Sequence, residues 1–246
     1  MNPIHRLIRL FGRELSRVPR PLAYNWRGWL RPSLGPLLAY MHLTHPDFFF
    51  IQVGAHDGQF ADPIHEFVER FRLRGLLLEP QPELFASLQI TYSHRPDLVL
   101  VNAAIAHEDG TVKLHRVKPK YAPEQWVTGT ASLLKEKLDS IGTQIKSLDQ
   151  LSEIIEVPAI TPRTLLHQYG VARFDLLQID TQGFDYEVIK LFDIEHNLPA
   201  IIHFEHDMLS TQEWEECISR LLNCGYRISH TGQDTLACRR DVIPAD

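Results

Sequence analysis

Short, continuously apolar runs alternate with amphipathic segments from residue 48 onward. The runs are FFFIQV, GLLLEP, DLVLVNAAI, FDLLQID and LPAIIHFEH, which begin at residues 48, 75, 97, 174 and 198. Strands that are apolar throughout are typical of parallel sheets whose two faces are covered by helices. The alternation therefore predicts an α/β fold with a mostly parallel sheet.

The segments between these runs carry the signals of helices. DPIHEFVERFRL places Asp62 as the N-cap and Pro63 at the first helical position. PELFASLQITY, DYEVIKLF and EWEECISRLLNCG predict three more helices. The chain closes on YRISHTGQDTLAC, two strand-like runs around a turn that contains glycine. This last segment predicts an antiparallel hairpin at the C-terminal edge of the sheet.

Composition narrows the class of protein. The 246 residues are 44% hydrophobic and 23% charged, which is ordinary for a globular domain. The formal net charge of −6 argues against a dedicated nucleic-acid-binding protein, because phosphate contacts need clustered Lys and Arg. Three cysteines without metal-ligand spacing suit a reducing cytosol. No apolar run reaches the roughly 20 residues of a membrane span, so we expect a soluble, cytoplasmic protein.

Residues 1–45 differ from the rest of the chain. They hold seven arginines and one acidic residue, Glu14. Apolar residues from Ile4 to Val18 follow helical spacing, which predicts an amphipathic helix with arginines on its other face. We therefore divide the chain into an Arg-rich N-terminal helical extension, 1–45, and an α/β domain, 46–246. The helix either packs on the flank of the domain or docks peripherally on an anionic lipid or glycan, as at an inner membrane surface.

The turn after the first run gives the first indication of a ligand. In VGAHDG the glycines Gly54 and Gly58 have the spacing G-x-x-x-G, not the G-x-G-x-x-G of dinucleotide-binding folds, and Asp57 would oppose a pyrophosphate. This spacing disfavours an NAD-dependent oxidoreductase. Glu79 ends the second run, where an acidic residue accepts hydrogen bonds from ribose hydroxyls. The pattern predicts a nucleoside ligand with a positively charged group.

Four blocks occur in a characteristic order and spacing: FIQVGAHDGQF, LLLEPQPELFASL, VTGTASL and FDLLQIDTQGFDYEVIK. They resemble, in turn, the glycine motif, the ribose-binding strand and helix, the small-residue loop and the fourth-strand motif of the FkbM-type methyltransferases. The resemblance covers most of the chain, from 48 to 240. It implies a Rossmann-like class I methyltransferase with a mostly parallel seven-stranded sheet, S-adenosyl-L-methionine as methyl donor and a hydroxyl as acceptor.

The resemblance also implies roles for individual residues. The donor site would comprise Gln52, Gly54, Ala55, Asp57 and Gly58 around the methionine part, Glu79 at the ribose, and Asn102 and Ala103 at the adenine. The chain departs from the family pattern in places: Gln52 stands for the usual Asp, His56 for Asn, and Thr181-Gln182 for Val-Glu. Gln52 can still bond an ammonium group through its carbonyl, without the stronger charge-assisted bond of an Asp.

Candidates for the general base lie at the ends of the fourth and fifth strands and in the glycine turn. Asp180 leads, because a carboxylate at the mouth of the central strands lies near the donor methyl; its alternative role is to bond the following turn or the donor's amine. The other candidates are Glu205, His206 and His56. In IIHFEHD, a divalent metal ion held by His203, Glu205, His206 and Asp207 is an alternative to a structural histidine pair, and no metal belongs to the predicted site.

Residues 111–160 are an insertion on the substrate side of the predicted domain. It contains the strand-like run TVKLHRV and the loop KPKYAPEQWVTG, and loops at strand mouths select the substrate. Tyr121 and Trp126 would stack on a sugar ring, with Lys118 and Lys120 near an anionic group. Thr128, Thr130 and Ser132 either touch acceptor or donor, or serve as turn residues and as the N-cap of a helix at LLKEKL.

The sequence therefore predicts an S-adenosylmethionine-dependent O-methyltransferase. The predicted acceptor is a small-molecule or glycan hydroxyl, above all on a saccharide or on a glycolipid or polysaccharide precursor. One alternative is methylation of a polyketide or other natural product. Another is a non-catalytic binding protein that has kept the fold, which Gln52 and Gln182 leave open and which Gly54, Glu79 and Asp180 argue against.

Overall fold

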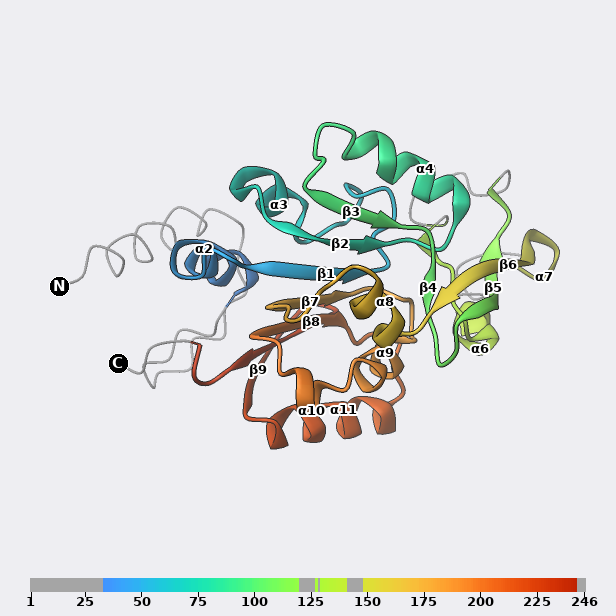
Figure 1. Ribbon diagram of the computed structural model, residues 1–246. Coiled ribbons are helices and arrows are strands. Elements are labelled where there is room, and N and C mark those ends of the chain that lie inside the picture. The colour runs from blue at the N-terminus through green and yellow to red at the C-terminus, as the bar shows by residue number, and fades with distance from the viewer. Residues whose placement is uncertain (1–32, 120–126, 128, 141–147, 243–246) are drawn as a thin grey trace.

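The computed structural model describes residues 33–119, 127, 129–140 and 148–242. These residues form a sheet between two layers of helices, with a smaller sheet at one end (Figure 1). The amphipathic helix predicted between residues 4 and 18 lies outside the described residues. The first described helix, α2 (Leu34–Thr44), precedes the predicted division at residue 45, and it packs Leu37, Leu38 and Met41 into the core beside the sheet.

The central sheet has seven strands in the order β3-β2-β1-β7-β8-β10-β9. They are β1 (Phe49–Val53), β2 (Arg74–Leu78), β3 (Leu98–Val101), β7 (Leu176–Ile179), β8 (Ile201–Glu205), β9 (Tyr226–Thr231) and β10 (Asp234–Arg239). The first five of these strands are parallel, and β10 is antiparallel to β8 and β9. The predicted mostly parallel α/β sheet with a C-terminal hairpin is confirmed. Within the hairpin, β10 lies inside the sheet and β9 forms its edge.

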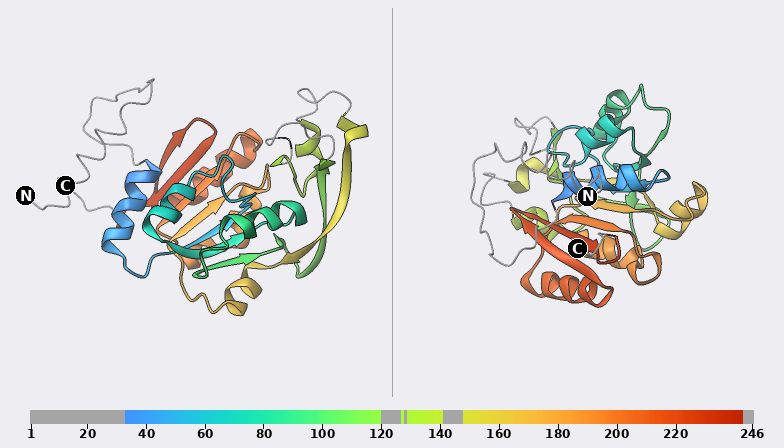
Figure 2. Two further views of the ribbon diagram at one scale, coloured as in Figure 1. Left: turned by 90° about the horizontal axis from the view of Figure 1, so that it is seen from above. Right: turned by 90° about the vertical axis from the view of Figure 1, so that its left-hand side faces the viewer.

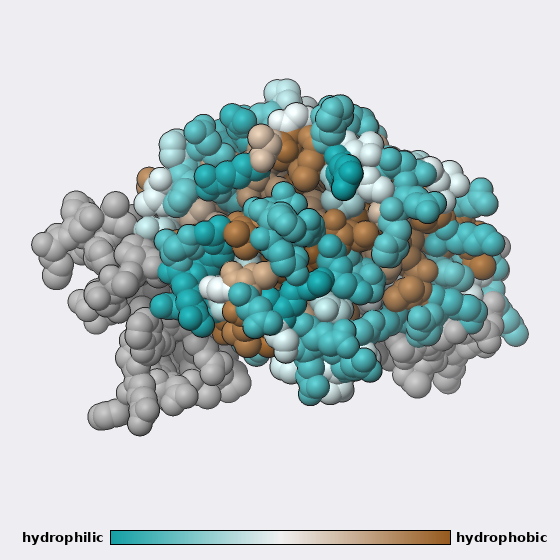
Figure 3. Space-filling model, turned by 60° about the horizontal axis from the view of Figure 1, so that its bottom comes forward, coloured by the Kyte–Doolittle hydropathy of each residue, from teal (hydrophilic) through white to brown (hydrophobic). Residues whose placement is uncertain are grey.

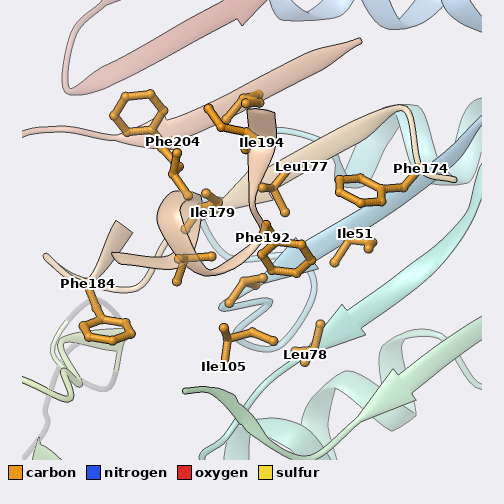
Figure 4. Packing of buried hydrophobic residues seen from close by; sticks show 14 of the residues in the cluster. Ile51, Leu78, Ile105, Phe174, Leu177, Ile179, Phe184, Phe192, Ile194 and Phe204 are labelled. Carbon is orange, nitrogen blue, oxygen red and sulfur yellow. The ribbon is translucent and has the colours of Figure 1, made fainter. Parts of the chain in front are cut away.

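Helices cover both faces of this sheet. α2, α3 (His65–Phe71) and α4 (Pro82–Thr91) lie on one face; α8 (Pro162–Gln168), α9 (Asp185–Leu191), α10 (Ile194–Asn197) and α11 (Thr211–Asn223) lie on the other. Successive strand residues point to opposite faces, so a strand covered on both sides must be apolar throughout. Ile51, Leu78, Ile179 and Phe192 meet in the core on the α9 side (Figure 4).

The outer helix α11 shows how the sequence sets an element. The Ser210 hydroxyl accepts the N–H of Glu213, and the Glu213 carboxylate accepts the N–H of Ser210, which forms a capping box. Cys217 and Leu221, four residues apart, are buried against the sheet. The face that carries α10 and α11 is mainly hydrophilic, with hydrophobic residues in separate small areas (Figure 3). Among the described residues, no helix has the length and apolar character needed to cross a membrane.

Two predicted boundaries are wrong by a few residues. α3 starts at His65, with Ile64 and not Asp62 as its N-cap, and so two residues after the predicted start at Pro63. The Asp62 carboxylate accepts the N–H groups of Ile64 and His65 at 2.8 and 3.2 Å and closes a turn before the helix. The sequence predicts the third apolar run, residues 97–105, as one strand, but its strand in the central sheet, β3, ends at Val101. Its last residues form β4 (Ala104–Ile105), which leaves the central sheet and pairs with another strand.

The predicted insertion builds a second sheet in the order β4-β6-β5 (Figure 2). β5 (Gly110–Val117) and β6 (Ser152–Ile160) form a long antiparallel pair, the β5–β6 arm. β5 contains the predicted strand, whereas β6 lies where charged residues and a proline obscure the apolar pattern. α6 (Lys135–Ser140) and α7 (Leu148–Leu151) lie between them. Ser132 is not the N-cap of α6: its hydroxyl accepts the N–H of Leu134 before the helix begins.

Arg95 ties the α3 side of the molecule together. Its guanidinium, with a side-chain exposure of 0%, donates to the carbonyl oxygens of Val68 at 2.9 Å and Leu73 at 2.8 Å. It also bonds the carboxylates of Glu69 and Asp97. These contacts join the end of α3 to the segments that enter β2 and β3.

We expect Arg95→Met to lower the free energy of unfolding by about 3 kcal/mol, because buried carbonyl groups and two carboxylates lose their donor. Arg72→Met is the matched control: its side chain is 66% exposed and lies 3.7 Å from Asp97, so the change should stay within about 0.5 kcal/mol. Urea denaturation measures both variants. Equal losses of unfolding free energy in the two variants would show that the buried contacts of Arg95 stabilise the protein no more than those of an exposed arginine.

Candidate functional site

A cavity of about 330 Å³ opens at the carboxyl ends of β1, β2, β7 and β8. Doubly wound α/β sheets bind their ligands at this edge. The cavity wall includes Gly54 after β1, Glu79 after β2, Asp180 after β7 and Glu205 at the end of β8. The fold thus brings together four predicted site residues from widely separated parts of the sequence.

Gly54 allows the ends of β1 and β7 to meet. Its φ is +82°, and a Cβ atom placed there would lie 1.8 Å from the carbonyl oxygen of Asp180. On the other side, its N–H donates to the carbonyl oxygen of Leu78 in β2 at 3.0 Å. The turn is held between two neighbouring strands, and only a residue without a side chain fits there.

The glycine turn also fixes the carboxyl group of Glu79. One carboxyl oxygen accepts the N–H of His56 and the other accepts the N–H of Gln81, both at 2.9 Å. Burial raises the pKa of Glu79 to about 8, although these two N–H donors oppose the change. Since a carboxylate oxygen can accept more than one hydrogen bond, Glu79 retains acceptor capacity for a hydroxyl in the cavity.

Ala103 and Asn102 take different positions after β3. Ala103 lines the cavity, as do the residues of β4 that follow it. The side-chain amide of Asn102 donates to the carbonyl oxygens of Glu79 at 2.8 Å and Pro80 at 3.1 Å. Asn102 is not part of the cavity wall; it supports the chain segment that carries Glu79.

Four predicted donor residues lie beside the cavity and not on its wall: Gln52, Ala55, Asp57 and Gly58. Burial alone would raise the pKa of Asp57, but N–H groups of Phe60 and Gln59, at 2.8 and 2.9 Å, lower it overall. Gly58 packs against Leu88 and Tyr92 of α4. These residues support the glycine turn without facing the cavity.

Gln52 belongs to a row of buried polar side chains below the site. It pairs in register with Gln178 of β7, which pairs in turn with His203 of β8. The Oε1 atom of Gln178 lies 2.8 Å from Nδ1 of His203, and burial lowers the pKa of His203 to about 4. The Oε1 atom of Gln52 is buried without a hydrogen-bond partner. The row is part of the packed sheet.

Asp180 and Glu205 share one hydrogen-bond donor. The side-chain nitrogen of Gln182 lies 2.8 Å from Oδ1 of Asp180 and 2.9 Å from Oε2 of Glu205. Burial raises the pKa of Asp180. Burial, with the charge of Asp180 in addition, raises the pKa of Glu205 to about 8. The cavity therefore contains acidic groups that hold protons more tightly than they would in water.

The four residues considered as metal ligands are not brought together. Nδ1 of His206 lies 3.0 Å from the Thr235 hydroxyl, and its ring packs on Trp214 away from the cavity wall. Asp207 accepts a hydrogen bond from Gln233 at 2.7 Å. In the part of the chain that the structure describes, no group of three or more His, Cys, Asp or Glu residues could hold a metal ion.

The β5–β6 arm and the segment before α6 close the other side of the cavity. Thr130 lines it, with its hydroxyl donating to the carbonyl oxygen of Val127 at 2.7 Å. Ser132 is 2% exposed and pairs with His115 of β5. Lys118 is half-buried and donates to the carbonyl oxygen of Gln150. The remaining candidates, Tyr121, Trp126, Lys120 and Thr128, lie outside the described residues.

The sequence missed the apolar part of the wall. Leu114, Leu133 and Phe184 line the cavity opposite the acidic strand ends. Phe184 and Ile105 belong to the core cluster of Figure 4, and both also line the cavity. Each is visible in the sequence as an apolar residue near a candidate motif. Their meeting depends on where the segment between β3 and β7 lies relative to the turn after β7, which no local pattern specifies.

The parallel sheet with its inserted β10 and its cavity at the strand ends defines a Rossmann-like class I methyltransferase fold. The family model described as "Methyltransferase FkbM domain" matches residues 52–228. The chain therefore belongs to the FkbM methyltransferase family.

A solved structure of an FkbM methyltransferase supports the fold. The FkbM methyltransferase of Methylobacillus flagellatus KT is 12% identical, with a TM-score of 0.50 over 87% of this chain and 46% of that chain. This chain thus spans less than half of that protein. Precorrin-6y C5,15-methyltransferase of Geobacter metallireducens GS-15 is 12% identical, with a TM-score of 0.40 over 82% of this chain and 85% of that chain. The comparison with curated proteins finds no match.

We expect Gly54→Ala to lower the free energy of unfolding by about 3 kcal/mol or more, because the added Cβ overlaps the Asp180 carbonyl. Gly170→Ala is the matched control. Gly170 also has a positive φ, +64°, but no atom lies within 4 Å of its Cβ position, so only the cost of the left-handed conformation, about 1–2 kcal/mol, applies. Denaturant unfolding compares the two, and similar losses would contradict the contact with Asp180.

The buried acids predict a stability that falls as pH rises. Burial raises the pKa of Glu79 and Glu205 to about 8 and that of Asp185 to about 7. Above pH 6.5 the unfolded chain has lost these protons and the folded protein still holds them, so the free energy of unfolding decreases with pH until about pH 8. Calorimetry should show a falling melting temperature across this window and a shallower slope for Glu205→Gln. A rising melting temperature would contradict the assignment.

Proposed function

We propose that the protein is an S-adenosyl-L-methionine-dependent O-methyltransferase that acts on a hydroxyl of a saccharide or of a glycolipid or polysaccharide precursor. The observation that carries the proposal is the meeting of Gly54, Glu79 and Asp180 at one cavity, in a member of the FkbM family. A polyketide or other natural product is the second acceptor class. Contact of the Arg-rich extension with anionic lipid or glycan is a separate prediction.

The cavity fits this donor in size and charge. Its volume of about 330 Å³ lies within the range of roughly 300–1,000 Å³ that small-molecule sites occupy. S-adenosylmethionine supplies, when bound, a methyl group on a positively charged sulfur. The carboxyl groups of Glu79, Asp180 and Glu205 favour such a cation over an anionic cofactor. Glu79, held by two main-chain N–H groups, is suited to accept hydrogen bonds from ribose hydroxyls.

The cavity wall is also suited to the acceptor. Sugars have polar edges and apolar ring faces, and the wall combines the amide groups of Gln182 and Gln233 with the apolar side chains of Leu114 and Phe184. Among the described wall residues none is Lys or Arg, which favours an uncharged acceptor over an anionic one. Asp180 would accept the hydroxyl proton, and a positioned base of this kind contributes about 10²–10⁴ in rate.

Isothermal titration of the full chain with S-adenosylmethionine tests the donor site. We expect micromolar binding by the wild type and at least about tenfold weaker binding by Glu79→Gln. The NH₂ group of Gln cannot accept the main-chain N–H that one carboxyl oxygen of Glu79 accepts, so the variant loses acceptors at the ribose end of the cavity. Glu66→Gln, an exposed residue of α3, is the matched control and should bind as the wild type does. Thermal unfolding of each variant verifies that it is folded.

The outcome also decides between enzyme and binding protein. Binding by the wild type leads to a screen of glycosides with labelled methyl donor, in which transfer to a hydroxyl supports the proposal. A folded wild type that does not bind S-adenosylmethionine would contradict it, and a non-catalytic binding protein would then explain the cavity better.

A further inference from the structure

Gln182 joins the two carboxyl groups that reach the cavity from β7 and β8. Its amide nitrogen donates to Asp180 at 2.8 Å and to Glu205 at 2.9 Å, and all three residues line the cavity. A primary amide nitrogen carries two hydrogens, so each carboxyl group can receive its own. The amide therefore holds the two acids close together inside the candidate site.

The main chain directs this amide toward the pair. Gln182 has a φ of 53°, in the left-handed region that residues other than glycine seldom adopt. The turn is held by Asp185, whose carboxylate accepts the Thr181 hydroxyl at 2.9 Å and the Gly183 N–H at 3.1 Å. A strained residue persists where its surroundings hold it, and such residues cluster at functional sites. The direction of the Gln182 side chain is therefore built into the turn.

The two acids have unequal surroundings. Burial raises the pKa of Asp180, but hydrogen bonds from the side chain and the main chain of Gln182, together with the nearby His56, oppose that rise. The charges that act most strongly on Glu205 are all acidic: Asp180, Asp185 of α9, Asp207, and Asp234, which lies directly opposite in β10. Glu79 adds a further acid near Asp180 from the end of β2. Donors favour an ionised carboxylate, whereas neighbouring carboxylates oppose it.

We propose that Gln182 is a positioning residue that separates the roles of this pair: Asp180 is ionised at neutral pH and receives the proton of the acceptor hydroxyl, and Glu205 keeps its own proton. Burial and acidic neighbours, which raise the pKa of Glu205 to about 8, agree with this division. Enzymes assign acid and base roles by separating the protonation of two nearby groups in this way.

The different protonation of Asp180 and Glu205 also indicates which acceptor fits the cavity; this inference about the acceptor rests on the proposed O-methyltransferase function. The hydroxyl proton passes to the Asp180 carboxylate and from there to solvent. A protonated Glu205 is a hydrogen-bond donor, while Asp180 is an acceptor. The pair therefore suits a hydroxyl with a second oxygen on the adjacent carbon, as in a vicinal diol of a polyol or sugar.

Infrared spectroscopy of the ligand-free full chain tests the division, because protonated carboxyl groups have their own C=O stretching band. Burial raises the pKa of Glu79 and Asp185 as well, so these groups contribute to the same band. The spectrum of each variant is therefore subtracted from that of the wild type. At about pH 6.5 we expect Glu205→Gln to lose the intensity of one protonated carboxyl group. Asp180→Asn removes no protonated group, but the loss of its charge lowers the pKa of Glu205 and Asp185, so its spectrum is compared at about pH 5.5, where it should lose no intensity.

Gln182→Met tests the positioning role, since Met has a similar length and no donor. We expect it to gain one protonated carboxyl group, which the double variant with Asp180→Asn lacks. Gln233→Met is the matched control: Gln233 also lines the cavity, but its amide bonds Asp207, so the spectrum should not change. If Gln182→Met does not fold, Gln182→Asn, which tolerates the left-handed backbone and is too short to reach both acids, should show the same gain.

An unchanged band in Glu205→Gln, or no gain in a folded Gln182 variant, would overturn the proposal. Titration with S-adenosylmethionine is a separate readout. Failure of the wild type to bind it would contradict the proposed function and leave the infrared result intact, so the two failures are distinguishable.

Discussion

The main chain of Gly54 lies so close to the carbonyl of Asp180 that no side chain fits between them. This contact joins the ends of β1 and β7, the two strands at the centre of the sheet. The chain that leaves β1 turns over Glu79, and the chain that leaves β7 turns toward Glu205. The acids of neighbouring strands are thus gathered at one cavity because two strand ends are packed without a gap.

The same packing lowers the stability of the protein when no ligand is bound. Glu79, Asp180 and Glu205 lie at strand ends from which most water is excluded, and their pKa values rise because the charged forms lose hydration. A cation in the cavity would offset that loss. The acidic strand ends therefore connect the fold to its ligand: they destabilise the empty protein and favour a positively charged partner.

Much of this arrangement can be predicted from the sequence, since apolar runs identify the strands and the residues after them mark the edge where a ligand binds. The prediction failed where contacts between distant segments decide the outcome. β6 is interrupted by charges because one of its faces is exposed, and β4 leaves the central sheet to pair with it. Gln52 lies within the glycine motif, at the position where the family usually has Asp, yet strand alternation buries it on the sheet face with Phe50. The bridge from Gln182 to Glu205 depends on a left-handed residue that no local pattern identifies.

The cavity has two halves with different structural origins. Strand ends of the central sheet supply its acidic residues, whereas Leu114 of the β5–β6 arm and, before α6, residues 129–131 and Leu133 belong to the rest of the wall. Arg116 of β5 fixes the arm by bonding Glu83 of α4 at 2.7 Å and Glu153 of β6 at 3.0 Å. Because α4 follows directly after Glu79, this ion pair sets the arm relative to the residue proposed to bind the donor ribose. Substitutions on the arm can therefore change that part of the cavity wall while the strand ends of the central sheet keep their positions.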